Sequence, residues 1–217
     1  MNDQINALKD DVAFMRALAQ EGRSAPLLGG ATMVAAGVIY TGATLVSWAI
    51  AAGLIAAPAT WLSGVWVVAT AIYLAVLSLL VSRWRRIGQP GSSATSNRAF
   101  RWAWTAGGCA LGSIFAGAIL AAHRLHSDLV FAIFPTIVLS IYGAAWTLTS
   151  VMSSRRWVRW VAAGCFAAAI GLAVLNTASQ IYLAFAAALM LLMTAPGIAL
   201  MRQEPARDLG QKSAKTA

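Results

Sequence analysis

Long uncharged stretches, separated by short basic clusters, dominate the pattern of apolar and polar positions along the chain. The four longest occupy residues 24–82, 102–123, 129–154 and 160–201. An α-helix needs about 20 apolar residues to cross a hydrocarbon core about 30 Å thick, so the first and last stretches are long enough for two spans each. The first pair divides at a turn around Pro58, and the last pair divides at the polar cluster of residues 176–180. The pattern therefore predicts six spans, at residues 27–51, 60–82, 102–122, 129–152, 160–178 and 180–201.

The predicted fold class is all-α. Backbone amides inside lipid must be hydrogen-bonded within their own segment, and the strict two-residue alternation of a barrel strand is missing from this sequence. We expect a six-helix transmembrane bundle at residues 27–202. Residues 1–26 precede it as a cytoplasmic amphipathic helix and connector, and the polar residues 203–217 follow it as a disordered cytoplasmic tail.

Composition and charge agree with this interpretation. Hydrophobic residues make up 59% of the chain and charged residues 11%, against about 25% charged residues in a soluble domain. All but one of the 16 Lys and Arg residues lie on one predicted side of the bundle, and Arg124 lies alone on the other. Because basic loops stay in the cytoplasm, both termini are predicted to be cytoplasmic. Topology and anionic lipid explain the positive charge, so we expect the lipid bilayer and no nucleic acid as a partner.

Residues 4–21 form the predicted amphipathic helix. Its apolar stripe follows helical spacing and consists of Ile5, Leu8, Val12 and Met15. Such a helix could lie on the membrane, dock on a protein, or pair with a second copy of itself. Four acidic residues in this region favour docking on the bundle or on a partner over adsorption to anionic lipid.

Chemistry-bearing side chains are scarce inside the predicted spans. None of the six contains Asp, Glu, Lys, Arg or His, which argues against an ion-coupled carrier and against an intramembrane enzyme. No catalytic motif appears either, so we expect no enzymatic activity and no cofactor. His123, His126 and Asp128 could in principle share a divalent metal. The alternative, a solvated loop, is favoured because no further His or Cys completes the site.

Three features inside the spans suggest contacts or a path. Two rows of small residues could form a dimer interface or pack within the bundle: Gly108, Gly112 and Ala116 in one row, and Ala163, Ala167 and Gly171 in the other. Hydroxyl residues on one face of the fourth span could line a solute path or bond to their own backbone: Thr136, Ser140 and Thr147, which follow Pro135. An Ile-Tyr pair at residue 72 recurs at residues 141 and 181 and hints at an internal repeat.

The stretch EGRSAPLLGG at residues 21–30 resembles the start of small polytopic proteins of bacterial inner membranes. The resemblance covers about 30 of the 217 residues and carries no catalytic or binding position. It implies a location in the bacterial inner membrane.

These features predict a non-enzymatic integral membrane protein with a structural, accessory or partner-binding role. A transporter or channel for an uncharged or weakly polar small solute is the alternative. A membrane sensor that signals through residues 4–21 is the second alternative.

Overall fold

The computed structural model of the chain describes residues 11–12, 27–58, 60–87, 94–125, 129–153, 155–175 and 177–203. None of these residues lies in a strand, which confirms the all-α fold class for this part of the chain. The elements are α2 (Gly30–Ala51), α3 (Thr60–Ile87), α4 (Thr95–Leu125), α5 (Leu129–Ala132), α6 (Phe134–Met152), α7 (Trp157–Leu172), α8 (Ala178–Leu189), the π-helical η1 (Met190–Thr194) and α9 (Ala195–Met201).

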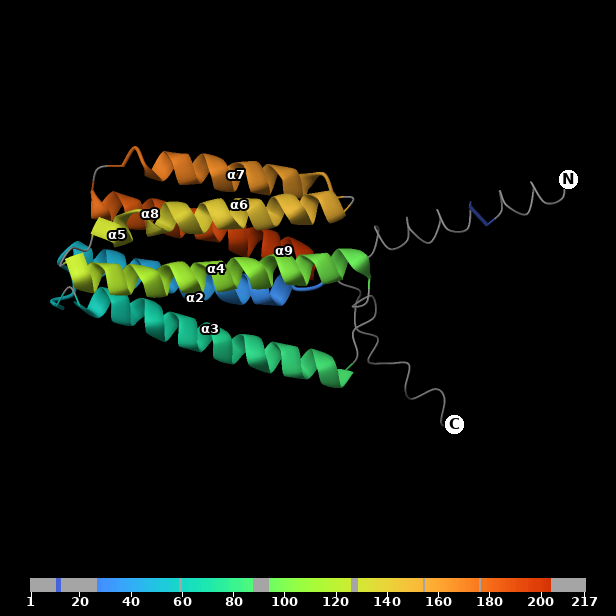
Figure 1. Cartoon of the computed structure of the whole chain (residues 1–217), viewed down its shortest axis with the longest axis horizontal. Helices are drawn as coiled ribbons and strands as arrows, with labels where there is room; N and C mark the ends of the chain where they lie inside the picture. The colour runs from blue at the N-terminus through green and yellow to red at the C-terminus, as the bar shows by residue number, and fades with distance from the viewer. Residues whose placement is uncertain are drawn as a thin grey trace, which may run out of the picture.

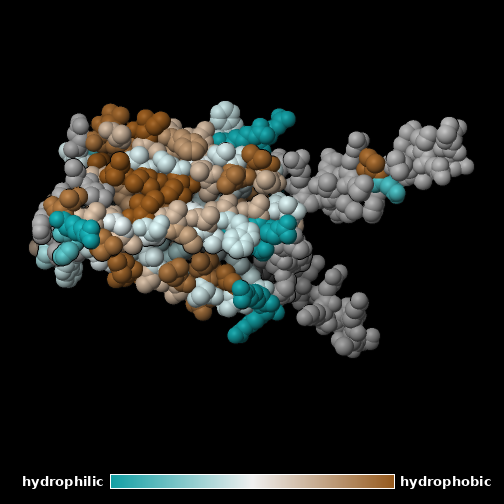
Figure 2. Space-filling model, in the orientation of Figure 1, coloured by the Kyte–Doolittle hydropathy of each residue, from teal (hydrophilic) through white to brown (hydrophobic). Residues whose placement is uncertain are grey.

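Five helices are long and apolar enough to cross a membrane, which indicates a lipid bilayer environment. They are α2, α3, α4, α6 and the continuous helix formed by α8, η1 and α9. The apolar helix α7 has 16 residues and is shorter than the others. On the face seen in Figure 2, brown apolar side chains cover much of the bundle, and teal polar side chains gather near the helix ends.

The predicted amphipathic helix at residues 4–21 lies outside the described residues, except for Asp11 and Val12, which are helical and exposed. The predicted tail also lies outside them, apart from Gln203.

The helices form two groups that run along a common direction (Figure 1). In the first group, α2 packs against α3 on one side and against α8, η1 and α9 on the other. In the second group, α6 packs against both α4 and α7. A hydrogen bond joins the groups at the start of α2, where the Leu28 backbone N–H donates to Asn97 Oδ1 at 2.8 Å. At the other end of α2, the Trp48 indole N–H donates to Ser179 Oγ at 2.8 Å and holds α2 against α8.

Glycine allows α2 and the last helix to approach each other closely. A Cβ atom added at Gly37 would overlap Thr194 Oγ1 and would lie 2.9 Å from the Thr194 backbone N. One added at Gly30 would lie 2.6 Å from the Met201 backbone N. Since small residues let membrane helices bring their backbones together, this contact is a principal helix interface of the first group.

Two prolines accompany irregularities in helices that the sequence presents as regular. Pro135 separates the four-residue α5 from α6, because its ring removes one backbone N–H and crowds the preceding turn. Pro196 follows η1, and it cannot donate to the Leu192 carbonyl four residues earlier. The Trp146 indole N–H donates to this carbonyl instead, at 3.1 Å.

Replacing Trp146 by Phe is expected to destabilise the protein by about 1–2 kcal/mol, because the partly buried Leu192 carbonyl loses its side-chain donor and the core loses volume. Trp146 is fully buried, whereas Trp160 is 79% exposed and provides the control as Trp160→Phe. The melting temperatures of both variants and of the unsubstituted protein, measured by thermal aggregation in mild detergent, give the difference in stability. Equal melting temperatures for the two would contradict the assigned role of this hydrogen bond.

Candidate functional site

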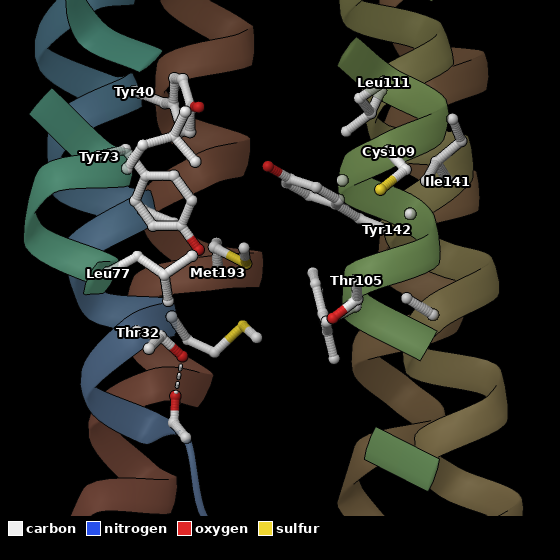
Figure 3. Close-up of a pocket in the computed structure, with 18 of the residues that line it drawn as sticks. Thr32, Tyr40, Tyr73, Leu77, Thr105, Cys109, Leu111, Ile141, Tyr142 and Met193 are labelled. Carbon is white, nitrogen blue, oxygen red and sulfur yellow. Dashed lines mark hydrogen bonds between the residues drawn. The ribbon is translucent and has the colours of Figure 1, made fainter. Parts of the chain in front are cut away.

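A cavity of about 1030 Å³ lies between the two helix groups. In Figure 3, α2, α3 and the last helix form one wall, and α4 and α6 form the other. Tyr73 and Leu77 lie on the first wall, and Tyr142 extends into the space from the second. The volume is at the upper end of the range for small-molecule sites, about 300–1,000 Å³.

Helical periodicity brings one face of α3 and one face of α4 to the cavity. The lining residues of α3 recur every three or four positions, from Trp66 near its start to Arg85 near its end. Those of α4 run from Asn97 to Phe115. Within the described part of the chain, α3 and α4 are not a packed helix pair. The cavity is therefore flanked by two helices whose membrane-spanning windows are mostly exposed.

Glycine residues on α4 help to keep the cavity open, because they place no side chain in it. Gly108 and Gly112 line it, and a Cβ atom added at either would meet no atom within 4 Å. Gly117, on the same helix, also has open space around it but is not a lining residue.

Aromatic side chains stiffen both walls. On the first wall, the Tyr40 ring stacks on Trp66 at 6.2 Å and lies 5.7 Å from Tyr73, measured between ring centroids. On the second wall, the Trp104 ring lies 5.4 Å from Tyr142 and packs edge-on against Trp146 at 5.2 Å. Such contacts hold large rings in fixed positions, so the cavity has firm walls.

The polarity of the lining changes along the cavity. One end carries Arg85 and Arg101, beside Trp84 and Asn97. The middle carries hydroxyl groups, including those of Tyr73 and Tyr142, which form no hydrogen bond with another described residue. The far end is aromatic and apolar, with Trp66, Phe115 and Phe134. This lining can bind a molecule that is largely apolar, and its hydroxyl groups can serve a few polar atoms.

The hydroxyl residues predicted to line a path are not among the residues that line this cavity. The Ser140 hydroxyl donates to the Thr136 carbonyl at 2.9 Å, and the Thr147 hydroxyl donates to the Gly143 carbonyl at 2.8 Å. These bonds match the alternative of hydrogen bonding to the helix backbone. The cavity uses another face of α6, through residues such as Val138, Ile141 and Tyr142.

Both predicted rows of small residues are exposed rather than packed inside the bundle. Gly108, Gly112 and Ala116 are exposed on α4, the first two on the cavity. Ala163, Ala167 and Gly171 are exposed on α7, whose buried face instead carries residues such as Ala162, Cys165 and Ala169.

Of the weak metal candidates, His123 is exposed near the end of α4, whereas His126 and Asp128 lie outside the described residues. In the described part of the chain, no group of three metal-ligating side chains occurs. The interaction helix is represented only by Val12, so the roles of Ile5, Leu8 and Met15 stay predictions.

Sequence reasoning missed both the cavity and the glycines that join α2 to the last helix. One signal pointed to the cavity, because three of the four Ile-Tyr pairs in the chain place their tyrosines on it, Tyr40 and Tyr73 on one wall and Tyr142 on the other. For the interface, the seven-residue spacing of Gly30 and Gly37 was a usable signal.

Comparison with family models, with curated proteins and with solved structures finds no match to this chain.

Proposed function

We propose that this chain is a non-enzymatic integral membrane protein that takes up a largely apolar, lipid-soluble molecule from the bilayer. The cavity between α3 and α4 is the observation that carries the proposal. It is large and mostly apolar, and its lining includes two tyrosine hydroxyls without a hydrogen-bond partner among the described residues, which can orient a polar group.

Access from the bilayer follows from the arrangement of the helices. Since α3 and α4 do not pack together over the described residues, a lipid-soluble molecule can enter sideways between them. A solute from water would instead have to pass the aromatic end or the basic end of the cavity. Lateral entry therefore suits an apolar molecule better than an aqueous solute.

Binding suits the cavity better than catalysis. Its ionisable lining consists of tyrosines, Cys109 and the two arginines at one end. A general base or an activated nucleophile needs a partner within hydrogen-bond reach. The exposed Cys109 thiol makes no hydrogen bond or ion pair with another described residue.

A photoreactive fatty alcohol carrying a diazirine in its chain tests the proposal. The full chain in nanodiscs is irradiated with this probe, and labelled residues are located by mass spectrometry. We expect labels on the cavity face of both α3 and α4, for example at Leu77 and Leu111. The substitution Gly112→Trp fills the cavity and should reduce these labels about tenfold or more, because the probe loses its apolar contacts.

Gly117→Trp is the matched control for this substitution, because it adds the same side chain to the same helix outside the cavity. Its labelling should equal that of the unsubstituted protein. Labels confined to outer helix faces, or an equal loss in both variants, would overturn the proposal.

An accessory role in a protein assembly is the second candidate, and the outward-facing small residues of α7 favour it. Ala163, Ala167 and Gly171 leave a flat exposed strip on a helix whose other face is buried. The substitution Ala167→Leu should then weaken an assembly that native mass spectrometry detects. An unchanged mass would remove this candidate. A sensor function through residues 4–21 stays a prediction.

A further inference from the structure

We infer that the occupant of the cavity is an anionic phospholipid of the membrane, bound with its headgroup between Arg85 and Arg101. This inference rests on the proposed function and adds the chemical class of the bound molecule.

Charge is concentrated at one end of the cavity. Arg85 lies near the end of α3 and Arg101 near the start of α4, so each wall supplies one guanidinium at the same end. Neither arginine forms a salt bridge with a described residue, among which Asp11 is the only acidic one. Two guanidinium groups that line the same end of one cavity favour an anionic group there, and their planar donor sets suit a phosphate.

The apolar part of the cavity suits acyl chains. Its lining on α3 extends from Arg85 to Trp66, about 28 Å along a helix at 1.5 Å per residue. One leaflet of the hydrocarbon core is about 15 Å deep. Chains that start at the arginines therefore have room to lie along the cavity past Leu77 and Tyr73.

The basic end also has the features of a membrane interface. Trp84 lies beside Arg85, and tryptophan rings collect at headgroup level. The neighbouring Asn97 side chain is 1% exposed and already accepts the Leu28 backbone N–H, which holds the start of α4 against the start of α2. A headgroup would therefore meet Arg101 on a helix whose start is already fixed to the other wall.

A free phosphate would satisfy only the two arginines and would leave the apolar walls uncovered. A lipid without net charge, such as phosphatidylcholine, would cover the walls, but its own ammonium group already neutralises its phosphate. An anionic phospholipid satisfies both parts of the cavity, and basic pockets between membrane helices are known to recognise such headgroups.

The test uses phosphatidylglycerol and phosphatidylcholine with identical diazirine-bearing acyl chains, each at the same low fraction in nanodiscs of neutral lipid. We expect phosphatidylglycerol to label the cavity face at Leu77, Val81 and Leu111 about tenfold more than phosphatidylcholine, because two arginines attract its charge. The double substitution Arg85→Gln/Arg101→Gln should abolish this preference.

The control is Arg86→Gln/Arg98→Gln, which removes the same charge from the same two helices at exposed positions outside the cavity. It should keep the preference for phosphatidylglycerol. Equal labelling by both lipids, or an equal loss of preference in both double variants, would overturn the inference. The proposed function would still stand if the neutral fatty alcohol labels the cavity. Failure of all three probes to label the cavity would overturn both.

Discussion

The substitution Gly37→Leu is expected to prevent the chain from assembling its native bundle. A Cβ at this position overlaps Thr194 Oγ1 and lies 2.9 Å from the backbone N and 3.1 Å from the Cα of the same residue. Two of these atoms belong to the backbone, so rotating a side chain cannot relieve the contact. The helix α2 would have to move away from the last helix, which is its most extensive interface.

The expected cost exceeds the gain in helix propensity. Replacing glycine inside a helix stabilises the helix by about 1 kcal/mol, whereas overpacking a close helix contact costs about 1–3 kcal/mol and sometimes more. The contact at Gly37 involves backbone atoms, so we expect about 3 kcal/mol or more of net destabilisation. The readout is the yield of monodisperse protein in mild detergent, followed by its thermal stability.

Gly42 provides a control on the same helix. A Cβ at Gly42 would meet no atom within 4 Å, so Gly42→Leu gains helix propensity without a clash. We expect this variant to be at least as stable as the unsubstituted protein. Comparable damage in both variants would show that α2 does not tolerate any bulky side chain and would contradict the assigned interface.

The fold class could be predicted from the sequence because it depends on the length and spacing of uncharged stretches, which a single chain displays directly. The irregular geometry inside the last helix could not be predicted in this way. The π-helical turn before Pro196 depends on where a neighbouring helix supplies a donor, as Trp146 does for the Leu192 carbonyl. A donor that lies 46 residues away in the chain has no local signature.

Helix contacts were harder to predict for a similar reason. Small residues are abundant in this chain, and the rows at Gly108 and Ala163 have the same spacing as a packed interface. Which row is covered depends on how the helices are arranged, and the structure covers Gly30 and Gly37 instead. The cavity is a product of the same arrangement, because Gly108 and Gly112 become lining residues only when no helix packs on them.

Both ends of the described helical bundle lie on the same side, which supports six membrane crossings. Gly30 begins α2 and Met201 ends α9, and a Cβ at Gly30 would lie 2.6 Å from the Met201 backbone N. An even number of crossings is needed to bring the chain back to its starting side. If the five long helices alone crossed, these two residues would lie on opposite sides, so we propose that α7 supplies a sixth crossing.

The length of α7 is the apparent obstacle. Its 16 residues span about 24 Å, which is less than the hydrocarbon core of about 30 Å. The chain compensates at the start of this helix, where Trp157 and Trp160 accompany Arg155, Arg156 and Arg159. Long basic side chains and amphipathic rings reach the interface from a shortened helix, and a bilayer can thin locally at modest cost.

Reporter fusions test this topology with an all-or-none readout. A fluorescent protein that matures only in the cytoplasm should be active when fused after Arg159 or after Met201, because basic segments stay on that side. A phosphatase that folds only after export should be active when inserted after His123. The same phosphatase fused after Met201 should be inactive, and activity there would mean that α7 does not cross.

With six crossings, Arg85 and Arg101 face the cytoplasmic leaflet, whose anionic lipids are those that the basic end of the cavity would recognise.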